Sequence, residues 1–143
     1  MDHLAIMRKS WGLTSKILTG EKKIESRWYK NKYQPWDRIK KGDNVYFKDS
    51  GSLVNIKCIV SKVLQYEDLT PARVADILNK YGSKDGLGVE DIPKFIEMFK
   101  DKKYCMLIFL ENAEEIEPFD IDKSGFGAMA AWISVENINE IKK

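Results

Sequence analysis

The apolar pattern of this chain changes its period twice along the sequence, and this limits the folds it can adopt. Over residues 53–66 apolar and polar side chains alternate, which predicts a half-buried strand. Over residues 70–99 the apolar positions recur every three or four residues, which predicts helices. Every residue from Tyr104 to Leu110 is apolar, as in a strand at the centre of a sheet. A helical segment therefore interrupts a series of strands.

Shorter apolar runs, together with turn and cap residues, predict the remaining elements. A short helix is expected over residues 11–19, with Ser10 as its N-cap and Gly20 as its last, left-handed position. Thr70 and Asp91 are expected to cap two helices in the middle of the chain. The expected strands comprise residues 4–7, 22–28, 45–48, 53–66, 104–110 and 128–135.

These elements predict an α+β fold of one domain spanning residues 1–143. We expect a mixed β-barrel of about six strands, with one N-terminal helix and a two-helix mid-chain insertion. The insertion, residues 67–103, is too short to form a separate domain. We expect a monomer, although the sequence leaves the oligomeric state open.

Nothing in the composition predicts secretion or membrane insertion. The N-terminus lacks the long apolar run of a signal peptide, and the longest apolar stretch is too short to span a bilayer. Cys58 and Cys105 stand alone inside apolar runs, which is typical of reduced core thiols. We therefore expect a cytoplasmic protein without a membrane partner.

The charge is unevenly distributed along the chain. Residues 1–66 hold 14 Lys and Arg against 6 Asp and Glu, whereas residues 67–143 hold 10 against 16. Trp11, Trp28 and Trp36 also lie in the basic half. Cations that attract phosphate, combined with rings that stack on bases, are typical of proteins that bind single-stranded nucleic acid. Alternatively, the lysines form a solvated face and the rings belong to the core.

A short motif in the basic half resembles a known family. Residues 20–27 read Gly-Glu-Lys-Lys-Ile-Glu-Ser-Arg, which resembles the ASCH signature, Gly-x-Lys-x-x-x-x-Arg with a glutamate two positions before the arginine. Lys9 lies one short helix upstream, where ASCH domains often carry a lysine. Residues 36–47 resemble the family's Gly-Asp-x-Val start of the next strand, and residues 127–135 its closing strand. The resemblance covers the chain apart from the helical insertion.

The chemistry of the motif can be interpreted without the family. On a strand Lys23, Glu25 and Arg27 share one face, and Lys22 is expected to lean over the same cleft. Glu25 would accept hydrogen bonds from the edge of a nucleobase, and Arg27 would donate to a carbonyl or phosphate. Crowded cations lower one another's pKa, which would make Lys22 a base. The alternative is a structural ion pair between Glu25 and Arg27 beside a solvated lysine.

The family resemblance implies one of two functions. ASCH domains belong to the PUA-like superfamily, which is linked to the recognition of RNA and modified bases. One bacterial branch is an amidohydrolase that removes the acetyl group of N4-acetylcytidine. Its catalytic lysine corresponds to Lys22 and its threonine to Glu25, although a carboxylate cannot replace the hydroxyl directly. Its glutamate has only Glu67 as a candidate here, and the hydroxyls of Ser26 and Ser50 lie off the pattern.

We therefore expect a binding module for RNA or a modified nucleoside, with a small amidohydrolase as the alternative. No cofactor and no metal are expected. The enzyme hypothesis assigns catalysis to Lys22 and Glu25. The residues expected to bind the nucleobase or RNA are Lys9, Lys22, Glu25, Arg27, Trp28, Ser50 and Trp132.

Other signals predict no chemistry. His3 is the only histidine, which argues against Ser-His and Cys-His catalysis, and we expect it to be an N-terminal bystander. Residues 120–125 resemble the start of an EF-hand loop, but Ala131 occupies the twelfth position, where a glutamate is required. A third hypothesis is a regulatory domain whose acidic helical insertion docks another protein.

Overall fold

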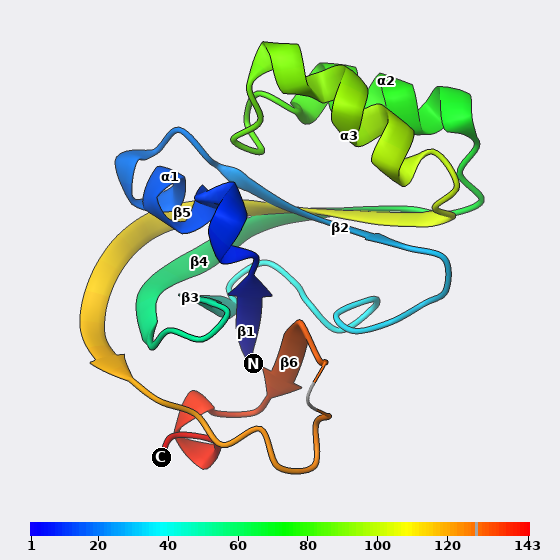
Figure 1. Cartoon of the computed structure of the whole chain (residues 1–143). Helices are drawn as coiled ribbons and strands as arrows, with labels where there is room; N and C mark the ends of the chain where they lie inside the picture. Colours follow the sequence, from blue (N-terminus) through cyan, green and yellow to red (C-terminus); the bar gives the residue numbers. More distant parts are fainter. Residues whose placement is uncertain (128) are drawn as a thin grey trace.

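Two long strands, β4 (Val54–Tyr66) and β5 (Tyr104–Phe119), form the centre of a strongly curved sheet (Figure 1). The computed structural model describes residues 1–127 and 129–143. The sheet order is β2-β5-β4-β3-β1-β6, and only β1 and β3 run parallel. The other strands are β1 (Asp2–Met7), β2 (Ile24–Tyr29), β3 (Asn44–Asp49) and β6 (Trp132–Val135).

The helices lie where the sequence predicts them. α1 (Leu13–Thr19) follows β1, whereas α2 (Pro71–Tyr81) and α3 (Ile92–Phe99) connect β4 to β5 and cover one face of the sheet (Figure 1). Three short 3₁₀ helices complete the elements: η1 (Lys9–Trp11), η2 (Val89–Asp91) and η3 (Ile138–Glu140). The predicted α+β fold with six strands, an N-terminal helix and a two-helix insertion is confirmed. The two end strands, β2 and β6, do not pair with each other, so the curved sheet stays open as a half-barrel.

The boundaries of some elements differ from those predicted. Ser10 lies inside η1 and does not cap α1, which begins at Leu13 after Gly12 turns the chain at φ 62°. Asp91 ends η2 and makes no capping hydrogen bond, whereas Thr70 accepts the predicted bond from the Arg73 amide.

Two strands also differ from the prediction. β5 continues to Phe119, because its polar second half still pairs with β4. β6 begins only at Trp132, and Ala128, where the predicted strand begins, lies outside the described residues.

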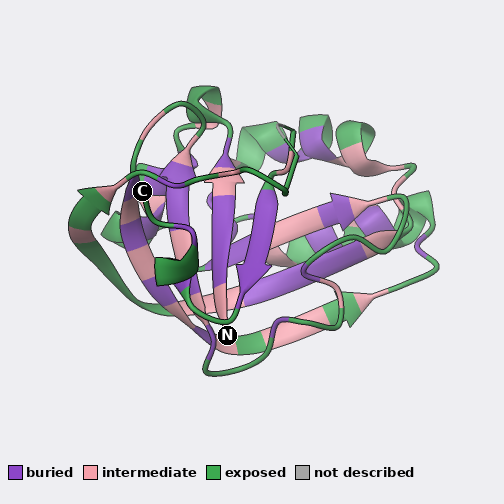
Figure 2. Ribbon diagram, turned by 90° about the horizontal axis from the view of Figure 1, so that it is seen from below, coloured by how far each residue is buried: buried purple, intermediate pink, exposed green. Residues whose placement is uncertain are grey.

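The core lies on both faces of the curved sheet. One apolar cluster fills the inside of the curve and includes Phe47, Cys58 and Ile108. A second lies between the sheet and helices α2 and α3, with Trp28 and Cys105 among its members. Figure 2 shows the strands of the sheet as the most buried part of the chain. Both cysteines are buried free thiols, and burial raises the pKa of Cys58 to about 12.

His3 is fully buried, so its expected role as an N-terminal bystander is wrong. Its Nδ1 lies 3.2 Å from the indole Nε1 of Trp132, which can only donate, and 2.9 Å from the hydroxyl of Ser134. Nδ1 therefore accepts, and Nε2 carries the proton that it donates to Asp43 at 2.9 Å. Burial lowers the pKa of His3 even though Asp43 opposes the shift. The imidazole joins β1, β6 and the turn before β3.

We predict that acid weakens the fold through this histidine. The unfolded chain binds a proton below a pKa of 6.5, whereas folded His3 binds it only at lower pH. The free energy of unfolding should therefore fall as the pH decreases from about 7 to about 5. Urea unfolding at several pH values measures how the free energy of unfolding changes with pH. The variant His3→Gln should be less stable than the wild type, but its stability should depend much less on pH. Equal slopes in the two proteins would exclude His3 as the cause.

Candidate functional site

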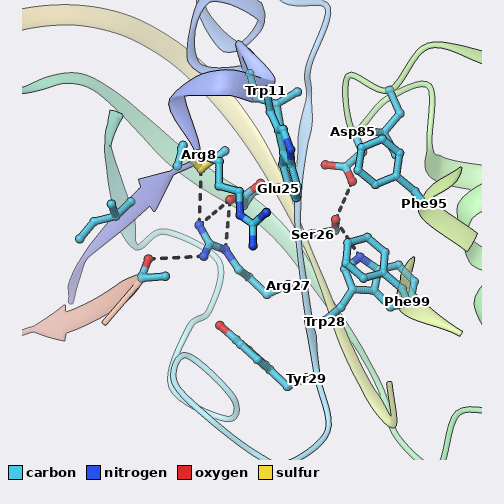
Figure 3. Close-up of a pocket in the computed structure, with 15 residues that line it drawn as sticks. Arg8, Trp11, Glu25, Ser26, Arg27, Trp28, Tyr29, Asp85, Phe95 and Phe99 are labelled. Carbon is cyan, nitrogen blue, oxygen red and sulfur yellow. Dashed lines mark hydrogen bonds and ion pairs between the residues drawn. The ribbon is translucent and has the colours of Figure 1, made fainter. Parts of the chain in front are cut away.

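A cavity of about 260 Å³ lies beside β2 at the free edge of this strand (Figure 3). β2 is the end strand of the sheet and pairs only with β5. The end of β1, η1, α3 and residues 82–88 form the other walls. The polar and aromatic residues of the lining are Arg8, Trp11, Glu25, Ser26, Arg27, Trp28, Tyr29, Asp85, Phe95 and Phe99.

Because the cavity lies at the strand edge, it is lined by side chains from both faces of β2. Glu25, Arg27 and Tyr29 share one face of the strand, and Ser26 and Trp28 share the other. The predicted sharing of one face by Glu25 and Arg27 is thus correct. The cavity lining nevertheless includes residues from both faces of β2, which alternation along the strand places on opposite sides of the sheet.

The main chain of β2 also faces this edge at alternate residues. The Ile24 amide donates to the Lys84 carbonyl at 3.0 Å, on the side away from β5, whereas the Lys23 carbonyl accepts from Leu110 in β5. Main-chain groups alternate in direction along an antiparallel strand. Those of Ser26 and Trp28 therefore point to the same side as those of Ile24, towards the cavity.

A buried cluster of charged groups lies behind this wall. Lys22, Glu25 and Asp85 are 2%, 3% and 6% exposed. The Lys22 ammonium donates to the carbonyls of Ile24 at 2.7 Å and Asp85 at 2.8 Å. It forms ion pairs with Oε1 of Glu25 at 3.1 Å and with Oδ1 of Asp85. Lys22 thus joins β2 to the loop that follows α2.

The three groups perturb one another's pKa values. Burial lowers the pKa of Lys22, but Asp85 and Glu25 outweigh burial and raise it above its ordinary value. Burial raises the pKa of Glu25, yet Lys22 and Arg27 reverse the shift and lower it. The pKa of Asp85 is raised by burial and by Glu25, against the effect of Lys22. Lys22 is therefore a protonated cation and Glu25 an ionised carboxylate.

Three expectations for this motif are wrong. Lys22 does not lean over the cleft, since its side chain is buried and absent from the cavity lining. Its pKa is raised instead of lowered, because its nearest charged neighbours are carboxylates and not cations. Lys23, placed on the same face as Glu25, precedes β2 and is exposed to solvent.

Arg27 is held in place at the cavity wall (Figure 3). Its Nε and Nη2 donate to Oε2 of Glu25 at 3.1 and 2.8 Å, and its guanidinium lies 5.1 Å from the Trp132 ring centroid. Further contacts run to the Met7 sulfur and, from Nη1, to the Ala131 carbonyl, both at 3.4 Å. The guanidinium also makes a hydrogen bond with the Tyr29 hydroxyl, which opposes the larger effect of burial in raising the pKa of Tyr29.

A second guanidinium, that of Arg8, lies at the same cavity. Arg8 follows β1, is exposed, and stacks over the Trp11 ring at 5.0 Å. In Figure 3 it lies near Arg27. The cavity therefore has two cationic groups on one side, and the carboxylate of Glu25 beside them is already bound by Arg27 and Lys22.

The opposite side of the cavity holds a hydroxyl bound to a carboxylate. Ser26 Oγ donates to Oδ2 of Asp85 at 2.5 Å and accepts from the Trp28 indole at 3.0 Å. The Trp28 ring stacks on Phe99, with centroids 5.1 Å apart and planes 5° from parallel. One face of Trp28 is thus covered by α3, and only 7% of the residue is exposed, which leaves little of the ring for a base.

Several residues singled out from the sequence lie elsewhere. Lys9 is exposed in η1, and Ser50 is exposed in the turn between β3 and β4. Neither lines the cavity. Trp132, expected to bind the base, is buried beneath Arg27 with 6% exposure, donates to His3, and does not line the cavity. Glu67 is exposed and lies 3.8 Å from Lys32. The structure brings together Lys22, Glu25, Arg27 and Trp28.

Sequence reasoning missed Asp85 and Arg8. Asp85 lies in the glycine-rich link between α2 and α3, 63 residues from Lys22, and its only local signal is the turn sequence Asp-Gly. Gly86 itself has φ 84°, and a Cβ there would lie 3.1 Å from the Lys22 side chain. Arg8 adjoins the Lys9 that the family pattern favours, and its position after β1 turns it towards the cavity.

Two classes of feature are absent from the described part of the chain. Residues 1–127 and 129–143 contain no group of three or more His, Cys, Asp or Glu side chains arranged to hold a metal ion. Within the same residues no helix has the length and the apolar composition needed to cross a membrane.

The backbone resembles solved structures of ASCH proteins. The crystal structure of ASCH from Zymomonas mobilis matches with a TM-score of 0.66 at 13% identity, covering 94% of this chain and 87% of that one. A single-residue variant of that protein gives a TM-score of 0.69 at 12% identity, covering 97% and 93%. The chain has the ASCH fold. The resemblance to the ASCH family predicted from residues 20–27 is thus confirmed for the fold.

Other comparisons limit what the ASCH fold implies here. A hypothetical protein of known crystal structure matches with a TM-score of 0.55 at 24% identity, covering 81% of this chain and all of that one. No protein-family model and no curated protein matches the sequence. At such low identities the likeness concerns the fold and does not extend to function.

We predict that the buried lysine is essential for stability. In Lys22→Met the carboxylates of Glu25 and Asp85 would lose their shared cation, and breaking a buried pair costs about 3–5 kcal/mol. The matched control is Lys23→Ala, an exposed neighbour that should change the free energy of unfolding by less than about 0.5 kcal/mol. Urea unfolding measures both. Similar stabilities of the two variants would show that the cluster does not hold the site together.

Proposed function

We propose that the cavity beside β2 binds a nucleobase, either of RNA or of a modified nucleoside. The observation that carries this proposal is the lining itself, in which aromatic rings, two guanidiniums and a hydroxyl–carboxylate pair surround about 260 Å³. Pockets for drug-sized ligands have about 300–1,000 Å³. A cavity just below that range suits one flat heterocycle.

The rings supply stacking surface. Trp11 lies edge-on to Phe95 with centroids 5.5 Å apart, and both line the cavity together with Tyr29 and Phe99. Trp11 is only half buried, and Arg8 covers part of it. Stacking of a base on aromatic side chains contributes about 1–3 kcal/mol per base.

The polar groups supply recognition of the base edge. The exposed Arg8 offers donors to a carbonyl or phosphate oxygen, and Arg27 would exchange its 3.4 Å contact with the Ala131 carbonyl for such an oxygen. The Ser26 hydroxyl and the main chain of Ser26 provide acceptors for an amino or imino group, whereas both oxygens of Asp85 are engaged by Lys22 and Ser26. Glu25 was expected to contact the base, but both of its oxygens are engaged by Lys22 and Arg27. Its role in this proposal is to orient Arg27.

The proposal predicts salt-dependent binding that requires Arg27. Quenching of the fluorescence of Trp11 and Trp28 by a short oligouridylate should give an affinity that falls as salt rises, because cations on the protein release counterions from phosphate. Arg27→Ala should weaken binding by about 10-fold or more, given about 1.5–3 kcal/mol for a hydrogen bond to a charged group. Arg27→Lys, which keeps the charge but loses the planar fork, is the matched variant.

Two outcomes would reject this role for the cavity. One is binding whose strength does not change with salt. The other is an unchanged affinity in Arg27→Ala, provided that circular dichroism shows the variant to be folded.

A second candidate function is hydrolysis of N4-acylcytidine-type nucleosides, and the contact between Ser26 and Asp85 favours it. The sequence offered Glu67 as the carboxylate, whereas Asp85 lies against both Lys22 and Ser26. Because the pKa of Lys22 is raised, the base in this mechanism would be Asp85. Asp85 would take the proton of Ser26 as the serine oxygen attacks the acyl carbon, and Arg27 would face the developing oxyanion. The bond from the acyl carbon to N4 would then break as Asp85 gives the proton to the leaving amino group, and water would hydrolyse the acyl-serine to the free acid.

The hydrolase hypothesis predicts slow release of acetate from N4-acetylcytidine, which chromatography of the cytidine product detects. Ser26→Ala should abolish it while Ser50→Ala, a serine outside the cavity, leaves it intact. No turnover by the wild type with several N4-acylcytidines would dismiss the hypothesis and leave nucleobase binding untouched.

A further inference from the structure

A second hollow, of about 630 Å³, lies between the loop that precedes β3 and the second half of β4. We call it the basic groove. Its walls are one segment on each side, residues 37–41 and residues 61–65. β3 pairs with β4 only as far as Ile59, so the continuation of β4 beyond that residue has no β3 partner on this side. The loop of residues 37–41 fills part of this space, and the part that stays open is the groove.

The groove is strongly cationic. Arg38, Lys40, Lys41 and Lys62 line it, and all four are exposed. Among residues 1–127 and 129–143 none of the four has an ion-pair partner. The single acid in the lining, Asp37, is already bonded through its carboxylate. This bond comes from a neutral amide and leaves the carboxylate charged, so the lining holds four cations against one anion.

The loop that carries these cations is anchored at two points. Asp37 and Gln65 exchange two hydrogen bonds of 2.8 Å, from the Asp37 amide to the Gln65 side chain and from the Gln65 amide group to the Asp37 carboxylate. Asp37 holds φ 59°, in the left-handed region that aspartate tolerates better than most residues. Ile39 is buried in the core beneath the sheet. The cations therefore project from a fixed backbone.

A strip of aromatic and basic residues connects the groove to the nucleobase cavity. Tyr29 lines the cavity, donates from its hydroxyl to the Gln34 carbonyl at 3.1 Å, and contacts the Tyr33 ring at 5.7 Å between centroids. Tyr33 is 59% exposed. Lys32 lies 5.8 Å above Trp36, next to the residue that begins the groove. Residues 29–41 thus lead from one hollow to the other.

We propose that the basic groove binds the phosphodiester backbone of a single-stranded RNA, one base of which occupies the cavity. The inference rests on the proposed function and narrows it, since the ligand is then a polynucleotide instead of a free nucleoside. An excess of cations beside an exposed ring is the combination that binds single-stranded nucleic acid, with phosphates on the cations and a neighbouring base on Tyr33. A nucleic acid carries one flat base for each anionic phosphate, whereas an acidic peptide supplies a flat group only where it has an aromatic side chain.

The test compares a polynucleotide with its monomer. Affinities of an oligouridylate of about eight nucleotides, within the usual site size of about 4–16, and of uridine monophosphate are measured over a range of salt concentrations. The oligonucleotide should bind more tightly and show the steeper salt dependence. Lys41→Ala or Arg38→Ala should lower the slope of log K against log salt by about 0.7 for each lost phosphate contact. Uridine monophosphate, which occupies only the cavity, should bind these variants as it binds the wild type. Lys142→Ala, far along the chain near Phe119, is the control and should change neither affinity.

Each other outcome overturns the inference in a recognisable way. Two results would reject RNA binding by the basic groove but not nucleobase binding by the cavity. One is equal affinity for the two ligands, and the other is an oligonucleotide salt slope that does not change in Lys41→Ala and Arg38→Ala. Binding of neither ligand removes both proposals. Polyglutamate that displaces the oligonucleotide and itself loses affinity in the same variants would assign the groove to an acidic peptide.

Discussion

The burial of one ammonium group between two carboxylates determines the arrangement of the whole site. Lys22 binds Glu25, which follows it closely on β2, and Asp85, which belongs to the helical connection between β4 and β5. Each carboxylate uses its other oxygen to hold a second side chain, Arg27 in one case and Ser26 in the other. Both polar sides of the cavity are therefore oriented by the same cation, which itself never contacts the cavity. Such a charge is costly to bury and is stable only because its partners are fully arranged around it.

The second constraint is the position of β2 at the end of the sheet. A strand inside a sheet presents one set of side chains to each face and uses its main chain for pairing. At the free edge, both sets of side chains and the unpaired main-chain groups become available to one cavity. The half-barrel leaves this edge open, and α3 and η1 cover it with aromatic rings. The same principle operates at β4, where the end of pairing with β3 makes room for the basic groove.

The sequence predicted what depends on local periodicity. The strands and the helical insertion followed from the apolar repeats, and the shared face of Glu25 and Arg27 followed from alternation along a strand. The motif around Gly20 identified the fold even though no family model matches the sequence. Lys22 was misplaced because it precedes the first residue of β2, where alternation gives no direction. Its pKa was misjudged because the nearest cations in the sequence are not its nearest neighbours in space.

Long-range contacts were beyond prediction. Nothing in the sequence around Asp85 shows that this carboxylate reaches a lysine 63 residues away. His3 was underestimated for the same reason, since its partners Asp43 and Ser134 are 40 and 131 residues distant. The exposed lysines were easy to recognise in the sequence, but their positions on the fold were not. The excess of positive charge in residues 1–66 was evident, but only the fold separates Lys40 and Lys41, which line a groove, from Lys9, which lines neither hollow.

Photo-crosslinking tests the central claim, that a base enters the cavity at the edge of β2, most directly. A short RNA carrying one 4-thiouridine is irradiated in complex with the protein, and the modified residues are mapped by mass spectrometry. The account predicts adducts on the rings of the cavity, Trp11, Trp28 or Tyr29. Adducts confined to residues outside the cavity would contradict it.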